Sequence, residues 1–229
     1  MIKSMLKFAV LKIKGRTIVF DKQVRDVDLI SLSFRQTICV LRGLLFLRKL
    51  VSLGTSVQVL TKYKAFFGRG VSIGSYSTID AMGENGFYIG AGSSIGSFSL
   101  LKVSGTLTSI GKGIKIGCNV GIGDFAHIGG AGGVIIGDDT IAGAYLSIHP
   151  ENHVFSDTNE LIRNQGVTRK GIEIGKNCWI GAKVTILDGS IVGNGCVIAA
   201  GAVVNGIFPN NVVIGGVPAK ILKEINNVK

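Results

Sequence analysis

The chain has 229 residues, of which 46% are hydrophobic and 17% charged, and it contains 34 glycines and 3 prolines. So much apolar mass can bury a large core, which excludes a disordered chain, and the glycines follow no Gly-X-Y period, which excludes collagen. The formal net charge is +11. Residues 1–64 hold 13 Lys or Arg against 3 Asp, a net +10, so we divide the chain into a basic N-terminal segment and an almost neutral remainder.

The basic N-terminal segment, residues 1–64, is expected to be partly helical. Residues 30–53 mix aliphatic and aromatic side chains with arginines and lysines, which predicts one or two short amphipathic helices. Two placements of these helices stay open: on the inner face of an anionic membrane, as a peripheral contact, or on the end of the main domain with their cations in water. We expect no nucleic-acid partner, because aromatic residues are few and no recognised motif occurs.

No segment is expected to cross a membrane. The longest apolar run in the first third of the chain, residues 37–47, is interrupted by Arg42 and is too short to span a bilayer. Residues 1–10 contain lysines but no apolar stretch followed by a small-residue cleavage site, so we expect no secretory signal. Both observations favour a cytoplasmic protein.

From residue 70 onward, aliphatic residues recur every six positions. The longest series are Ile110, Ile116, Ile122 and Ile128, and then Ile174, Ile180, Ile186, Val192, Ile198 and Val204. Three positions after such an aliphatic come residue types that tolerate a positive φ angle at a corner: Gly113, Asn119, Asp139, Asn177, Gly189, Gly195 and Gly201. A period of six fits neither an α-helix nor simple β alternation, and it predicts a short strand followed by a corner, repeated around a three-sided coil.

Stacked coils of this kind would pair as parallel strands about 4.8 Å apart, with one inward aliphatic per side resting on those of the next coil. The hexapeptide pattern resembles that of the left-handed β-helix proteins. We therefore predict an all-β solenoid, with a left-handed parallel β-helix over residues 65–217 and a short C-terminal helix or tail over residues 218–229.

The repeat has one long interruption, from residue 149 to residue 173. It contains two of the three histidines, His149 and His153, and the third, His127, lies in a preceding hexad. A long loop in an otherwise economical repeat is typical of a functional segment. The four cysteines form no metal-binding or disulfide pattern, so we expect them to be core thiols.

Four sequence blocks occur in an order that is typical of one enzyme family: Asn-His at 152–153, IGKNCWIGA at 174–182, AAGAVV at 199–204 and GGVPAKI at 215–221. With these blocks the chain resembles the hexapeptide-repeat acyltransferases, in particular the sugar and polysaccharide O-acetyltransferases. The resemblance implies acetyl-CoA as the donor, no metal, a homotrimer with its site between neighbouring subunits, and His153 as the base that deprotonates an acceptor hydroxyl. We expect direct transfer within a ternary complex.

The resemblance also implies roles for further residues. Supporting positions around the base are His149, Glu151, Asn152 and Asp157. Contacts to the donor are expected from Trp179, Ala182, Lys183, Ala200, Gly201, Asn205, Lys220 and Lys223. Of these, Asn205 departs from the family, which commonly has Thr-Lys at 205–206. The candidates for holding the acceptor are Asp124 and His127.

The resemblance implies a saccharide acceptor, such as a bacterial surface polysaccharide (capsule or O-antigen) or its lipid-linked precursor. The basic, apolar N-terminal segment favours an acceptor that is held at the membrane. An antibiotic, a nucleotide sugar or serine stay open as smaller acceptors. Two other classes also stay open: a γ-type carbonic anhydrase, which is a zinc enzyme with three histidines on the same kind of coil, and a solenoid without catalysis.

Overall fold

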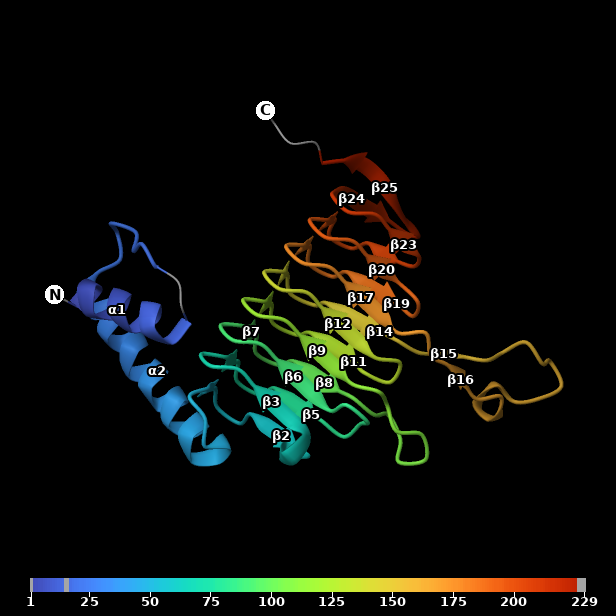
Figure 1. The fold of residues 1–229 in the computed structure, drawn as a ribbon, viewed down its shortest axis with the longest axis horizontal. Helices are drawn as coiled ribbons and strands as arrows, with labels where there is room; N and C mark the ends of the chain where they lie inside the picture. Colours follow the sequence, from blue (N-terminus) through green and yellow to red (C-terminus); the bar gives the residue numbers. More distant parts are fainter. Residues whose placement is uncertain (1, 15–16, 226–229) are drawn as a thin grey trace.

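The structure is a computed structural model that describes residues 2–14 and 17–225. Two helices, α1 (Ile2–Lys14) and α2 (Asp26–Leu47), precede a three-sided parallel β-helix that runs from β1 (Ser52–Leu53) to β24 (Val212–Gly216). The coils stack as one column, and α2 leans away from it with α1 alongside (Figure 1). The predicted left-handed β-helix of hexapeptide repeats, with a helical N-terminal segment, is confirmed.

Three sheets form the sides of the β-helix, and we call them the first, second and third sheet in the order in which the chain enters them. The first sheet contains β1, β4 (Ser72–Ile73), β7 (Ser94–Ile95), β10 (Gly121–Ile122), β13 (Ile141–Ala142), β18 (Trp179–Ile180), β21 (Val197–Ile198), β24 and β25 (Ala219–Glu224). The second sheet contains β2 (Gln58–Leu60), β5 (Thr78–Asp80), β8 (Leu100–Lys102), β11 (His127–Gly129), β14 (Ser147–His149), β19 (Thr185–Leu187) and β22 (Val203–Val204).

The third sheet contains β3 (Ala65–Phe67), β6 (Phe87–Ile89), β9 (Ile114–Ile116), β12 (Val134–Ile136), β17 (Ile172–Ile174), β20 (Ile191–Val192) and β23 (Ile207–Phe208). Outside the three sheets, β15 (Asn152–His153) pairs with β16 (Val167–Thr168), and two short 3₁₀ helices, η1 (Lys62–Lys64) and η2 (Ile162–Asn164), lie in connections.

The core is a column of inward aliphatic side chains, one per side of each coil. Ile116, Ile136 and Ile174 occupy equivalent positions in paired strands of the third sheet, and each is at most 2% exposed. Small residues follow them because the coils approach closely at the corners. A Cβ on Gly90, for example, would lie 2.6 Å from backbone atoms of Gly117 and Cys118 in the next coil. The residues that recur every six positions are therefore the ones that pack in the core, as predicted.

The corners adopt the backbone conformation that the residue types indicated. Asn119, Asp139 and Asn177 have φ angles of 53° to 60°, and Gly189, Gly195 and Gly201 also have positive φ. The short polar side chains of asparagine and aspartate tolerate this left-handed region better than most residues do. These corners are confirmed.

The β-helix begins at Ser52, earlier than residue 65, where the change in charge suggested a boundary. Leu53, Val59 and Ala65 are six positions apart, and all three are at most 9% exposed. Net charge describes the outer surface of a segment, whereas a coil requires only the inward aliphatic residues. The first coil is therefore basic outside and apolar inside, and the charge boundary does not mark its start.

Two further expectations are wrong. Ile110 is 48% exposed, because residues 105–110 leave the coil between β8 and β9 instead of forming a hexad. Residues 219–224 form the strand β25 and not a helix, and β25 pairs antiparallel with β24. The last coil would otherwise leave an unpaired strand edge, and β25 supplies partners for the backbone groups of that edge.

Helix α2 is longer than the sequence pattern suggested. It has 22 residues, and its most apolar 18-residue window has a mean hydropathy of 1.4, so by length and composition alone it is able to cross a bilayer. Asp28 accepts a hydrogen bond from the backbone N–H of Arg25 at the start of the helix. The expectation that no segment is long and apolar enough is therefore wrong for α2.

Candidate active site

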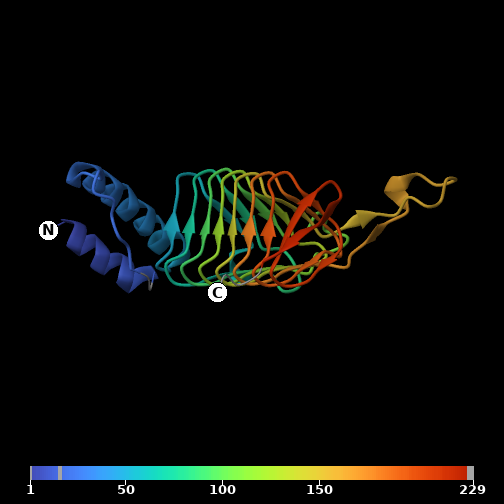
Figure 2. The ribbon, with the colours of Figure 1, turned by 90° about the horizontal axis from the view of Figure 1, so that it is seen from above.

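The long interruption of the repeat is a projecting loop, residues 150–171, which leaves the β-helix at the corner between β14 and β17 (Figure 2). Its base is held by Asp188, which is 5% exposed and accepts hydrogen bonds from the backbone N–H groups of Lys170 and Gly171 at 2.9 and 2.8 Å. Arg169 Nε donates to Glu151 Oε2 at 2.6 Å across the same base. The fold thus fixes the two ends of the loop and lets its middle extend outward.

His153 lies on β15 in the arm of this loop, opposite Val167 of β16. Its side chain is exposed and borders a shallow hollow of about 550 Å³, which Asn152 also lines. Among the described residues, no side chain is hydrogen-bonded to this imidazole, so both ring nitrogens are free to meet a ligand. The expected catalytic position is therefore an accessible one.

The two carboxylates expected to support His153 are engaged elsewhere. Glu151 pairs with Arg169, and Asp157 accepts a hydrogen bond from the backbone N–H of Asn159 at 2.8 Å. Neither is hydrogen-bonded to the ring of His153. Among the described residues of one chain, no carboxylate is therefore in place to orient this imidazole.

The other two histidines form a pair on the outer face of the second sheet. The rings of His127 and His149 lie 5.3 Å apart, and His149 Nε2 is 2.7 Å from Ser147 Oγ. Partial burial, and then the nearby charge of protonated His149, lower the pKa of His127 below its ordinary value of 6.5. The sequence did not suggest Ser147; the signal available was its place one coil after His127 in the same strand register.

Asp124, the other acceptor candidate, has a structural contact. Its Oδ1 accepts a hydrogen bond from the backbone N–H of Ser97 in the coil below, at 2.6 Å. The carboxylate therefore helps to fix a corner between the first and second sheets, and it lies at a different corner from the loop. The structure brings His127 and His149 together but does not bring Asp124 to the histidine of the loop.

The residues expected to contact the donor gather in part at one corner. Ala182, Lys183, Ala200 and Gly201 lie exposed where β18 and β21 of the first sheet turn into β19 and β22 of the second sheet. The N–H of Gly201 donates to the carbonyl of Ala182 at 2.9 Å, so the two coils are in close register. We call these four residues the donor corner.

The remaining donor candidates lie away from the donor corner. Trp179 is 57% exposed on β18, on the first sheet, and Lys220 and Lys223 lie on β25 at the end of that sheet. Asn205 follows β22 and therefore stands at the corner between the second and third sheets. The structure thus does not bring Asn205 to the donor corner.

A ladder of four aromatic rings continues the donor corner toward the N-terminal coils. Tyr76, Phe98, Phe125 and Tyr145 have φ angles between 57° and 61°, and neighbouring rings are stacked 4.9 to 5.2 Å apart. Bulky residues rarely adopt this left-handed conformation, and here the stacking compensates for it. Each ring stands three positions after an inward residue, as Lys183 and Gly201 do. That spacing is the signal in the sequence, although aromatic residues are not types that indicate a corner with positive φ.

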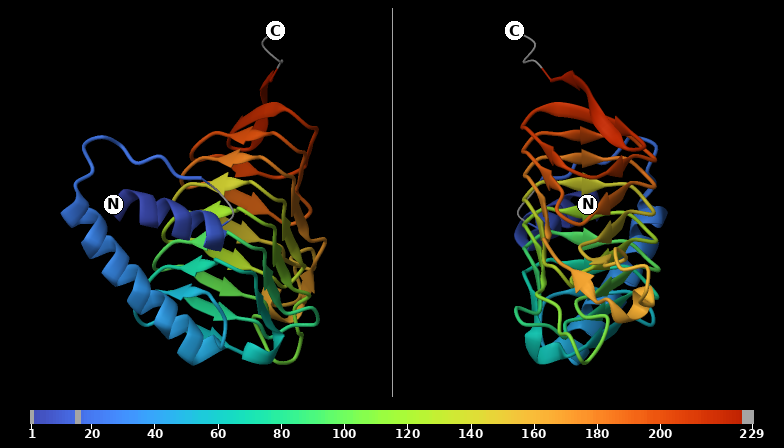
Figure 3. Two further views of the ribbon diagram at one scale, coloured as in Figure 1. Left: turned by 60° about the vertical axis from the view of Figure 1, so that its left-hand side comes forward. Right: turned by 90° about the vertical axis from the view of Figure 1, so that its right-hand side faces the viewer.

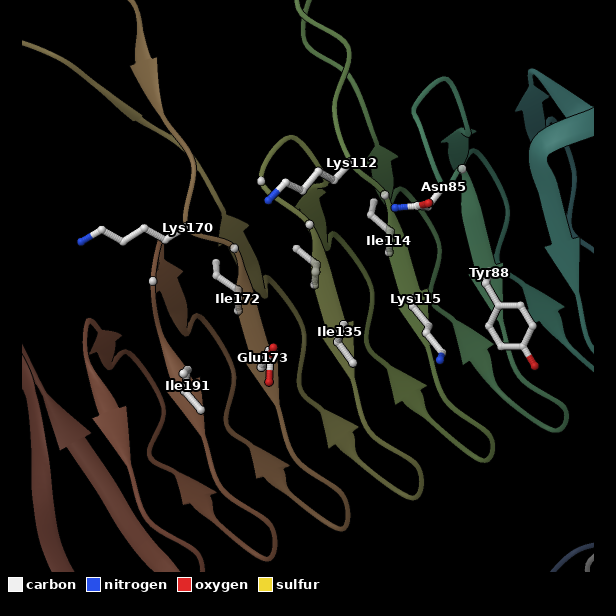
Figure 4. A pocket seen from close by; sticks show the side chains of 17 residues that line it. Asn85, Tyr88, Lys112, Ile114, Lys115, Ile135, Lys170, Ile172, Glu173 and Ile191 are labelled. Carbon is white, nitrogen blue, oxygen red and sulfur yellow. The ribbon is translucent and has the colours of Figure 1, made fainter.

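A second hollow, larger than the one beside His153, lies on a different side. It has a volume of about 840 Å³ and follows the third sheet and its corner glycines, with Lys112, Lys115 and Lys170 around it (Figure 4). On its floor, Tyr88, Lys115, Ile135, Glu173 and Ile191 form an outward row across neighbouring strands (Figure 4). This hollow contains neither a donor-corner residue nor a histidine.

Comparison with known proteins agrees with this architecture. Residues 171–206 match the family model for the bacterial transferase hexapeptide (six repeats). A putative lipopolysaccharide biosynthesis O-acetyl transferase, WbbJ, of Escherichia coli K12 is 37% identical over 129 residues, which cover 53% of this chain and 66% of that protein. The galactoside O-acetyltransferase of the same organism is 37% identical over 98 residues, which cover 41% of this chain and 45% of that protein.

Among solved structures, the polySia-specific acetyltransferase NeuO has a TM-score of 0.51 at 21% identity, over 79% of this chain and 78% of that chain. This likeness concerns the fold. The chain spans slightly less than two thirds of the first curated relative and under half of the second. In its hexapeptide coils, in the segment that matches the family model and in these relatives, the chain is similar to the bacterial hexapeptide-repeat transferases.

Proposed function

We propose that this protein is an acetyl-CoA-dependent O-acetyltransferase that acts on a saccharide hydroxyl. The observation that carries the proposal is the accessible His153, which the long loop presents with both ring nitrogens unengaged by the described side chains. The names of the two Escherichia coli relatives, both O-acetyltransferases, support the reaction class. Imidazole is the side chain that most often acts as a general base, and it is able to accept the proton of a hydroxyl group.

The proposed reaction is a direct transfer. His153 takes the proton of the acceptor hydroxyl while its oxygen attacks the thioester carbonyl of acetyl-CoA. The tetrahedral oxyanion that forms needs hydrogen-bond donors, and backbone N–H groups at a coil edge are of the right kind. When the C–S bond breaks, the imidazolium returns the proton to the leaving thiolate, so the products are the acetyl ester and CoA.

Two copies are needed to form this site. The donor corner precedes the second-sheet strands, whereas the loop with His153 follows them, so the two lie at opposite edges of the second sheet in one chain. A loop that projects outward cannot face the far edge of its own sheet, but it is able to reach the donor corner of a neighbouring copy. This geometry supports the homotrimer that the family resemblance implies.

His127 and His149 fit an acceptor-binding role better than a metal site. A zinc lyase needs three imidazoles on one ion, and over the described residues no three His, Cys, Asp or Glu side chains gather closely enough to hold a metal. A His127 ring with a lowered pKa is neutral at pH 7, so it presents one N–H donor and one acceptor nitrogen, as a sugar hydroxyl requires.

We propose a cytoplasmic enzyme whose acceptor is a capsule or O-antigen unit, attached to a lipid at the inner face of the membrane. The basic segment at residues 1–64 supports this choice, because binding to anionic lipid would bring the enzyme to an acceptor in the same membrane. A soluble small acceptor stays the alternative.

The experiment is acetyl-CoA consumption, measured by thiol release, across a panel of free sugars, nucleotide sugars and polysaccharides, with a serine and an antibiotic arm. His153→Ala should lower kcat about 10²- to 10⁴-fold with the best acceptor, the usual contribution of a general base. His153→Gln is the matched control for the size and polarity of the side chain. Full activity of His153→Ala would contradict the proposed base, and no turnover with any acceptor would favour a solenoid without catalysis.

A further inference from the structure

The outer face of α2 carries a continuous apolar stripe that nothing in the described chain covers. It consists of Val27, Ile30, Phe34, Leu41 and Leu45, each between 51% and 78% exposed. Their intervals of three, four, seven and four residues place them on one side of an α-helix. We call these five residues the α2 stripe.

The opposite face of α2 holds the helix against the rest of the protein. Leu29 is 4% exposed, and Gly43 packs so closely on the carbonyl group of Val51 that it leaves no space for a Cβ. Arg42 donates from Nη1 to the carbonyl of Leu53 at 3.5 Å, in the first coil. Because these contacts fix the orientation of α2, its stripe points away from the β-helix, and α2 leans outward in two views (Figures 1 and 3).

Helix α1, which packs beside α2, adds to the same surface chemistry. Met5 and Phe8 are 66% and 63% exposed, and Lys12 Nζ lies 5.6 Å from the centre of the Phe8 ring. An apolar ring with a cation beside it suits the membrane interface, because the ring enters the lipid while the cation stays among the headgroups.

The charge of this region selects the partner. Between Asp28 and Asp80 the sequence contains no acidic residue, while Arg35 and Arg48 follow along α2 and at its end. A helix-to-helix contact with a protein commonly alternates positive and negative residues beside its apolar seam. Asp26 and Asp28 stand only in the first turn of α2, and beyond them the apolar stripe has only cations beside it, which complements an anionic lipid leaflet.

We propose that α2, assisted by α1, lies in the plane of an anionic membrane with the α2 stripe among the lipid chains. A spanning orientation is disfavoured, because Arg35 and Arg42 stand in the middle of the helix, where a bilayer core would strip their hydration. The close contact of Gly43 with the first coil also keeps the C-terminal turns of α2 on the β-helix. The docking depends on these surfaces alone, so it can hold whether or not the proposed acetyl transfer does.

The test is co-sedimentation of the full chain with vesicles of phosphatidylglycerol and phosphatidylethanolamine, compared with phosphatidylcholine vesicles. We expect at least tenfold stronger partition into the anionic vesicles, weakened by 0.5 M salt. Phe34→Glu with Leu41→Glu should lower that partition at least tenfold. The matched control is Leu107→Glu with Ile207→Glu, which makes the same charge change at residues that are 77% and 74% exposed elsewhere, and it should bind like the original protein.

A second measurement does not depend on the acidic variants. Trp179 is the only tryptophan, so Phe34→Trp in a Trp179→Phe background places a single reporter in the stripe. Its fluorescence should shift to the blue and be quenched by brominated lipid. Equal binding of all variants, or no shift of the reporter, would overturn the proposal. Vesicle binding that resists extraction with alkaline carbonate would show that α2 spans the bilayer, and it would overturn the in-plane docking. If the original protein bound no vesicles and the acidic variants lost self-association, the stripe would instead be a contact with a second copy.

Discussion

The coils of the β-helix and helix α2 are both rich in aliphatic residues, but they use them in opposite ways. Ile116 is fully buried in its coil, whereas Leu41 of α2 is 51% exposed. The coil repeats its inward position on three sides, so every aliphatic meets another above and below. The helix has two apolar faces and the protein covers only one of them. Apolar content alone therefore says little about burial until the period and the partner of each face are known.

The largest effect that sharpens this contrast concerns stability. Ile116→Ala should lower the free energy of unfolding by about 2–5 kcal/mol, because it opens a cavity between tightly stacked coils. Leu41→Ala should change it by at most about 0.5 kcal/mol, because its side chain is half exposed. Urea unfolding followed by circular dichroism checks both. Equal losses for the two variants would show that the α2 stripe is packed in solution.

An intermediate effect concerns the loop, which differs from the coils because a few polar contacts hold it. Asp188→Ala removes the acceptor of two backbone N–H groups, and hydrogen bonds to a charged group stabilise by about 1.5–3 kcal/mol each. The amides of Lys170 and Gly171 should then exchange with deuterium at least ten times faster. Asp188→Asn, which keeps one acceptor oxygen, is the control and should show a smaller increase. Unchanged exchange in Asp188→Ala would mean that Arg169 and Glu151 hold the loop without it.

The smallest effect concerns pH. The folded state lowers the pKa of His127 below 6.5, so the unfolded state binds more protons in the interval between the two values. The free energy of unfolding should therefore be at its full value above pH 6.5 and fall as the pH drops through the lowered pKa. His127→Gln should reduce that slope, and His149→Gln should raise the pKa of His127, seen in its proton NMR titration. A pKa of His127 that His149→Gln leaves unchanged would contradict the coupling.

The sequence determined the parts of the fold that depend on short spacing. The hexads from Ile174 to Val204, the left-handed corners at Asn119 and Asn177, and the loop that begins after Ile148 could all be predicted, because each coil side needs one inward aliphatic and one permissive corner. Ile110 was misassigned because it keeps the spacing of six by chance, and spacing does not show whether a segment has left the column.

Only the tertiary structure decided which residues meet across coils and which faces stay open. The pairing of His127 with His149, the aromatic ladder and the capping of the last coil by β25 depend on the register between strands about 20 or more residues apart or on a free edge, and neither is a local property. The same holds for the separation of His153 from the donor corner and for the exposed α2 stripe. Local periods fix where a side chain points along its own strand or helix, whereas the stacking of whole elements fixes what it faces.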